Sequence, residues 1–124
     1  MTRAVLPTML SAGAGRIVLV SSVAGKSAEG NRTAYCAAEW GLQGFSLALR
    51  DELTGTGVRV HVVNPASVAT DRWTTTGDPQ PALVMERMLA AEDVAGTTLW
   101  MLTRPEHVQI DEIVVHNARH PWHV

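Results

Sequence analysis

Apolar residues fall into short continuous runs separated by longer amphipathic stretches, a pattern that predicts strands alternating with helices. The short runs cover residues 16–20, 58–63 and 110–115 and are rich in Val, Leu and Ile, which is typical of strands in a parallel sheet. Between the first two runs, residues 34–53 have the broad apolar coverage of a long helix. The order strand, helix, strand, helix, strand with short connections predicts a doubly wound parallel α/β sheet.

The remaining segments are predicted from their breaking residues. Residues 2–12 have the pattern of the C-terminal part of a helix, which Gly13 ends. Residues 21–33, rich in Gly, Ser and Asn, are expected to form a loop, and the polar residues 66–81 a mobile one. A short helix is expected over about 82–90. Another, capped by Asp93, should reach residue 102 or 103.

Composition restricts the function classes. The 124 residues, 46% hydrophobic and 18% charged, suffice for one small globular domain. A formal net charge of −2 provides no basic surface for nucleic acid or an anionic membrane, so neither is expected as a partner. The single cysteine, Cys36, excludes an internal disulfide, and no apolar run approaches the roughly 18 residues that span a bilayer. We therefore expect a cytoplasmic protein.

Two hydroxyl-bearing residues stand where chemistry is usually placed in such a sheet. Ser22 directly follows the apolar run 16–20, and Tyr35 opens the long helix thirteen residues later. The segments Arg-Ile-Val-Leu-Val-Ser-Ser (16–22) and Thr-Ala-Tyr-Cys-Ala-Ala-Glu (33–39) that carry them resemble the active-site segment of the short-chain dehydrogenase/reductase family. This resemblance implies a Rossmann-like fold and hydride exchange between NAD or NADP and a small carbonyl or alcohol substrate.

The resemblance also assigns a role to each of these residues. Ser22 would donate a hydrogen bond to the substrate oxygen, and Tyr35 would supply or remove its proton. Family members place a lysine four residues after the tyrosine, where its cation favours the phenolate and contacts the cofactor ribose. Here that position is Glu39. At about 5 Å and an effective dielectric constant of about 20, this reversal of charge disfavours the phenolate by about 6 kcal/mol.

Two other cations, Lys26 and Arg32, lie near the tyrosine in sequence, although neither has the family spacing. Further along, Asn-Pro-Ala-Ser-Val-Ala-Thr (64–70) resembles the family segment next to the nicotinamide, which implies cofactor contacts by Pro65, Val68 and Thr70. The family's glycine-rich phosphate turn has no counterpart, because Gly13 and Gly15 precede a strand instead of following one. The chain therefore resembles the C-terminal half of such an enzyme, lacking the N-terminal dinucleotide-binding strands.

On this basis residues 1–124 form a single partial domain. Its parts are the end of a helix (1–12), the active-site strand, loop, helix and next strand (16–65), a substrate loop (66–91), the final helix and strand (92–116) and a tail (117–124). The histidines 116, 120 and 123 have helical spacing, but Pro121 interrupts it, so no metal site is expected.

Three interpretations of the function remain open. The chain belongs to an oxidoreductase that is inactive alone, it is a non-catalytic module that assembles through its helices, or it is a truncated product without its own function. Full-length relatives are expected to be homo-oligomers. Without its N-terminal strands the isolated chain is also expected to associate, because Ile17, Val18, Leu19 and Val20 would be exposed.

Overall fold

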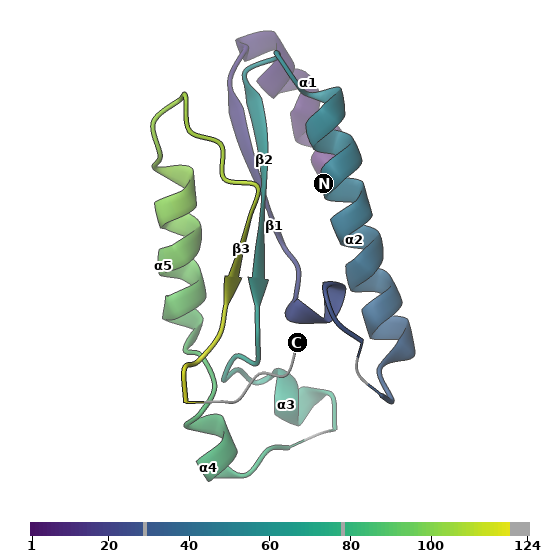
Figure 1. Ribbon diagram of the computed structural model, residues 1–124, viewed down its shortest axis with the longest axis vertical. Coiled ribbons are helices and arrows are strands. Elements are labelled where there is room, and N and C mark those ends of the chain that lie inside the picture. Colours follow the sequence, from purple (N-terminus) through teal and green to yellow (C-terminus); the bar gives the residue numbers. More distant parts are fainter. Residues whose placement is uncertain (29, 78, 120–124) are drawn as a thin grey trace.

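Three parallel strands form a sheet between two layers of helices (Figure 1). The computed structural model describes residues 1–28, 30–77 and 79–119. The strands are β1 (Gly15–Val20), β2 (Val58–Pro65) and β3 (Glu112–Val115), in the order β1-β2-β3. Gly15 pairs with Val58, and Val62 pairs with Glu112. The predicted parallel α/β sheet is confirmed.

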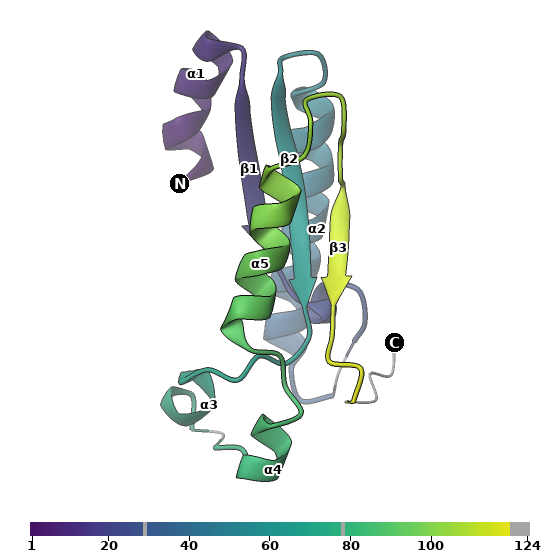
Figure 2. The same cartoon turned by 90° about the vertical axis from the view of Figure 1, so that its left-hand side faces the viewer.

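The helices are distributed over the two faces of the sheet. Helices α1 (Thr2–Ala12) and α2 (Thr33–Glu52) cover one face, and α5 (Ala91–Leu102) covers the other, as the view in Figure 2 shows. The core under α1 and α2 is made by five buried side chains with Leu6, Met9 and Leu19 packed against them: Ile17, Leu49, Leu53, Val58 and Val60. On the other face, Met101 of α5 and His61 of β2 are almost completely buried.

The amino-terminal turns explain how the strands start in register. Gly13 ends α1 in the left-handed conformation with a φ of 62°, which glycine adopts without the steric cost of a side chain. Gly57 precedes β2 with a φ of 80°, and a Cβ there would lie only 2.0 Å from the carbonyl oxygen of Gly13. The two turns therefore touch through their backbones, which only glycine at position 57 permits.

Several expectations about burial and loops were wrong. Strand β1 is not covered evenly on both faces, since only Ile17 is buried while Val20 is 60% exposed. Ile17 is therefore not among the residues that would drive association. The expected loops 21–33 and 66–81 contain the short helices η1 (Val23–Gly25) and α3 (Arg72–Thr75), whereas α4 (Ala82–Met85) lies where a short helix was expected over about 82–90. Hydrogen bonds local to each segment, invisible to hydrophobic periodicity, form these turns.

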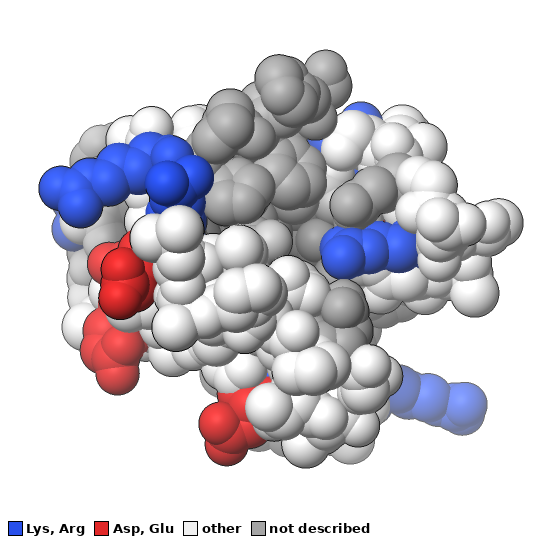
Figure 3. Space-filling view, turned by 90° about the horizontal axis from the view of Figure 1, so that it is seen from below, with Lys and Arg blue, Asp and Glu red and all other residues white. Residues whose placement is uncertain are grey.

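The long helix is also less buried than its composition indicated. Leu49 and the capping residue Leu53 are buried, but Trp40, Phe45 and Leu47 are 53%, 44% and 61% exposed. Of the described residues, no helix is long and apolar enough to cross a membrane. On the face seen in Figure 3, basic and acidic side chains lie apart in small groups among uncharged residues.

Candidate active site

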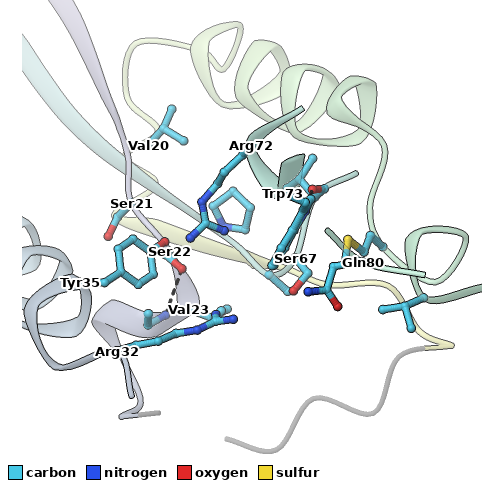
Figure 4. A pocket seen from close by; sticks show the side chains of 16 residues that line it. Val20, Ser21, Ser22, Val23, Arg32, Tyr35, Ser67, Arg72, Trp73 and Gln80 are labelled. Atoms are coloured by element: carbon cyan, nitrogen blue, oxygen red, sulfur yellow. Dashed lines mark hydrogen bonds between the residues drawn. The ribbon is translucent and has the colours of Figure 1, made fainter. Parts of the chain in front are cut away.

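A pocket of about 370 Å³ lies at the carboxyl ends of β1 and β2, where the sheet meets α2, α3 and α4. Figure 4 shows the side chains that line it. Ser22 and Tyr35 come from separate elements, and both line this pocket. Besides these two, its lining includes Ser21, Arg32, Pro65, Ser67, Val68, Arg72, Trp73 and Gln80. Ligands of open parallel sheets bind at this end of the strands.

Ser22 is held in a defined orientation by the turn that follows β1. It caps η1 from an extended conformation, and its Oγ accepts a hydrogen bond from the backbone N–H of Ala24 at 3.1 Å. A serine hydroxyl has one donor and two lone pairs. The bond from Ala24 uses one lone pair, so the O–H of Ser22 is left to donate into the pocket.

Ser21 is engaged differently, although it precedes Ser22 directly. Its hydroxyl donates to the carboxylate of Glu39 at 2.8 Å and accepts from Nε2 of Gln43 at 3.0 Å. The same Gln43 nitrogen donates to Oδ1 of Asn64 at 2.5 Å. This network connects β1, α2 and β2 below the pocket. The side chain of Glu39, half-buried one turn after Tyr35, is therefore hydrogen-bonded to Ser21.

Tyr35 is the third residue of α2 and is half-buried, with its ring at the pocket wall. The guanidinium of Arg72 lies over this ring, 5.5 Å from its centre. On its other side the same guanidinium lies 4.9 Å from the ring of Trp73. Figure 4 shows Arg72 between the two aromatic side chains. Such contacts attract a cation to the electron-rich faces of aromatic rings.

Of the expected cofactor contacts, Pro65 and Val68 line the pocket and Thr70 does not. Pro65 ends β2 and is buried, while Val68 is half-buried and its carbonyl accepts from Nε1 of Trp73 at 2.8 Å. Thr70 is exposed, and its carbonyl is 3.5 Å from the backbone nitrogen of Trp73. The structure therefore brings Ser22, Tyr35, Pro65 and Val68 together.

The two cations that lie near Tyr35 in sequence, Lys26 and Arg32, are placed differently in the structure. The ammonium of Lys26 is 2.7 Å from the carboxylate of Glu112 on β3, whereas Arg32 lines the pocket beside Tyr35. Sequence reasoning missed Arg72 and Trp73, because residues 66–81 were interpreted as a mobile loop. The isolated tryptophan in that otherwise polar segment was the available signal, since a large aromatic residue usually packs.

The candidate metal ligands cannot be compared as a set. His116 is exposed, and His120 and His123 lie outside the described residues. Within residues 1–28, 30–77 and 79–119, no group of three potential metal ligands exists.

With the fold and the pocket defined, comparison with known proteins identifies the class. The family model for short chain dehydrogenase matches residues 1–81, so the chain belongs to the short-chain dehydrogenase/reductase family. Among its relatives, sulfoacetaldehyde reductase 2 of Chromohalobacter salexigens is 38% identical over 98% of this chain and 50% of that protein. The NADP-dependent 3-hydroxy acid dehydrogenase of Schizosaccharomyces pombe is 37% identical over 93% of this chain and 46% of its own length.

A solved structure gives the same result for the fold. The closed form of serine dehydrogenase complexed with NADP+ superposes with a TM-score of 0.87 at 32% identity, covering 98% of this chain and 52% of that one. The chain thus spans about half the length of these relatives. Its three-strand sheet matches the Rossmann-like fold of the family over about half of the domain.

Proposed function

We propose that the chain forms the catalytic, C-terminal half of an NADP-dependent oxidoreductase that interconverts a small carbonyl compound and its alcohol. The observation that carries this proposal is that Ser22 and Tyr35, from different elements, line one pocket at the carboxyl ends of the parallel strands. The O–H of Ser22 is not used in the hydrogen bond with Ala24, which supports a role as hydrogen-bond donor to the substrate. Relatives that bind or depend on NADP support the choice of cofactor.

The residues of the pocket fit the nicotinamide end of that cofactor. Pro65 and Val68 give an apolar wall next to Ser22 and Tyr35, as a flat aromatic ring requires. When bound, the nicotinamide would supply or accept the hydride. This chain has no glycine-rich turn that could bind the diphosphate of the cofactor. The segment after β1 forms η1 instead, and no glycine-rich turn follows β2. We therefore assign the rest of the cofactor site to a second half outside these residues.

Two residues of this chain would handle the substrate oxygen. The O–H of Ser22 would donate to it and stabilise the negative charge that develops there. The phenol of Tyr35 would transfer its proton to the same oxygen during reduction and take it back during oxidation. Glu39, hydrogen-bonded to Ser21, stands where the family has a cation, so proton transfer by Tyr35 would be slow in this chain. Small acids and aldehydes appear in the names of the relatives, which supports a small polar substrate.

The test is to complete the domain. We would fuse residues 1–124 behind the N-terminal half of the sulfoacetaldehyde reductase relative and follow NADPH consumption with a panel of small aldehydes. We expect slow turnover that Tyr35→Phe abolishes and that Ser22→Ala lowers by about a hundredfold or more. Thr54→Val, at an exposed residue just beyond the far end of α2 and outside the pocket lining, is the matched control. A fusion that melts cooperatively and binds NADPH but has no Tyr35-dependent turnover would contradict the proposal.

The exposed apolar side chains of α2 favour a second candidate, a non-catalytic module that assembles with another copy of itself. Trp40, Phe45 and Leu47 are 53%, 44% and 61% exposed on this helix. Sedimentation of the chain with and without Trp40→Gln and Leu47→Gln tests this function. A wild-type monomer at tens of micromolar, indistinguishable from the double variant, would rule assembly out.

A further inference from the structure

Arg72 is the pocket residue whose chemistry the proposed function does not use. Its guanidinium lies 5.5 Å from the ring centre of Tyr35 and 4.9 Å from that of Trp73. Those contacts place the guanidinium carbon over the faces of the two rings. Within the described residues, the N–H groups at its edge make no hydrogen bond and no ion pair. Because a guanidinium has five N–H donors and no acceptor, this edge can bind an acceptor atom of water or of a ligand.

The charged residues in the described lining of the pocket are arginines, in a chain whose formal net charge is −2. Its lining has two arginines, Arg32 and Arg72, and no aspartate or glutamate among the described residues. The nearby Glu39 is bonded to Ser21, and Asp71, the neighbour of Arg72, does not line the pocket. An anion entering the pocket therefore meets no carboxylate among the described lining residues.

Other arginines of the chain show what is unusual about this arrangement. Arg104 also stacks on a tryptophan, 4.5 Å from the ring centre of Trp100, but its Nε donates to the carbonyl of Trp100 at 2.9 Å. Arg16 and Arg59 likewise donate to backbone carbonyls. The N–H groups of these three arginines are therefore bonded to the protein's own backbone. Arg72 has similar contacts with aromatic rings, but none of its donors is bonded to a carbonyl of the described residues.

We propose that Arg72 binds the acid group, a carboxylate or a sulfonate, of the substrate whose carbonyl or alcohol oxygen contacts Ser22 and Tyr35. The substrate class is then a small hydroxy or oxo acid, and Arg72 determines specificity. A planar guanidinium beside two aromatic rings can present two parallel N–H groups to two oxygens of such an acid. The proposal rests on the proposed function, because that function defines which oxygen reacts.

The first experiment measures binding without turnover. The isotope-labelled chain is titrated with lactate and with propylene glycol, which differ by a carboxylate in place of a neutral CH₂OH, while NMR follows the indole N–H of Trp73. That N–H donates to the carbonyl of Val68, so it reports on the pocket wall. A third titration uses isethionate, a small hydroxy sulfonate. We expect lactate and isethionate to shift this resonance and propylene glycol to leave it unchanged.

The variants make the result specific. Arg72→Gln should weaken the binding of both acids by about tenfold or more, and Arg72→Lys should restore only part of it, because lysine lacks the two-pronged geometry. Arg104→Gln, which alters the other stacked arginine, should bind the acids like the wild type. Equal binding by wild type and Arg72→Gln, a shift with propylene glycol of the same size, or no binding of either acid would overturn the proposal.

The cofactor is the alternative source of an anion. If pyrophosphate shifts the Trp73 resonance through Arg72 and the two acids do not, Arg72 belongs to the cofactor site and the proposal is wrong.

The fusion protein gives a second measurement. Succinic semialdehyde should have a higher kcat/KM than butanal, and Arg72→Gln should remove this preference mainly by raising the KM for succinic semialdehyde. Tyr35-dependent turnover with no such preference would refute the role of Arg72 and leave the oxidoreductase proposal intact.

Discussion

At the amino ends of the strands arginines donate to backbone carbonyls, whereas at the carboxyl ends they line a pocket. Arg16 and Arg59 are register partners on β1 and β2. Arg16 donates to the carbonyls of Leu102 and Arg104, and Arg59 donates to that of Val108 at 3.0 Å. These carbonyls end α5 or follow it and have no partner within the helix. At the opposite end, Arg72 lines the pocket, and its donors have no hydrogen-bond partner among the described residues.

The contrast shows how one residue type serves stability at one edge of a sheet and recognition at the other. At the amino ends, the chain itself supplies the acceptors, since α5 terminates there and its last carbonyls need donors. At the carboxyl ends, residues of η1, α3 and α4 line the pocket, but no carbonyl of the described residues accepts a hydrogen bond from Arg72, so its donors are available to a ligand. Substitutions at the two edges should therefore affect different measurements.

The largest expected effect is on catalysis at the carboxyl end. In the fusion protein, Glu39→Lys should raise turnover by about a hundredfold or more near neutral pH, because it places a cation one helical turn from Tyr35 and favours the phenolate. Steady-state kinetics of alcohol oxidation measures this, and the rate should rise at lower pH than in the unsubstituted fusion. Tyr35→Phe in the Glu39→Lys background is the control and should abolish the gain. Equal activity with glutamate and lysine would show that Arg32 or Arg72 already supplies the cation.

The second prediction concerns stability at the amino end. Arg16→Met should lower the free energy of unfolding by about 2 kcal/mol, because two carbonyls at the end of α5 lose charged donors. Arg72→Met is the matched variant and should lower it by no more than about 1 kcal/mol, since it loses the contacts of an exposed cation with two aromatic rings but no hydrogen bond. Urea unfolding followed by circular dichroism compares them. If both variants lose the same stability, the distinction between the two edges fails.

The third prediction uses the histidine that lies between these edges. His61 is 1% exposed, and its Nδ1 lies 2.6 Å from the carbonyl oxygen of Ile110. Because a carbonyl only accepts, Nδ1 carries the hydrogen, and the buried Nε2 has no hydrogen-bond partner among the described residues. Burial lowers the pKa of His61 below 6.5; the bond to Ile110 opposes this, and the charges of Arg16, Arg59 and Arg50 add to it.

The sign of the pH dependence follows. Above about pH 6.5 His61 is neutral in both the folded and the unfolded chain, so the folded state keeps its full stability. As the pH falls below that value, His61 becomes protonated in the unfolded chain but stays neutral in the folded chain. The free energy of unfolding should then drop by up to about 1.4 kcal/mol per pH unit. His61→Leu should remove this contribution between about pH 6.5 and 5.5, while the exposed-site control His107→Gln should keep it.

The sequence predicted the framework of this molecule better than its details. The runs around Ile17, Val60 and Ile113 identified all three strands of the described sheet, because burial between helices requires continuous apolar residues. Ser22 and Tyr35 were predicted as a pair, and they share the pocket. Arg72 and Trp73 were missed, because their position depends on contacts of α3 with α2 and with the segment that follows β2, which hydrophobic periodicity does not encode. The bond between Glu39 and Ser21 likewise joins residues far apart in sequence.

The smallest expected effect tests an ion pair at the carboxyl end. Lys26 lies 2.7 Å from Glu112, and both side chains are more than a third exposed to solvent. Water screens such a pair, so Lys26→Met should lower the free energy of unfolding by no more than about 0.5 kcal/mol, and high salt should remove the difference. Urea unfolding at low and high salt measures it, with the Glu112→Gln variant as the partner in a double-mutant cycle. Glu112 also accepts from Nδ2 of Asn64 at 3.4 Å, so Glu112→Gln reaches the network that holds Ser21 and Glu39. If Lys26→Met instead lowered the free energy of unfolding by about 2 kcal/mol at both low and high salt, a cation at the carboxyl end would also contribute to stability.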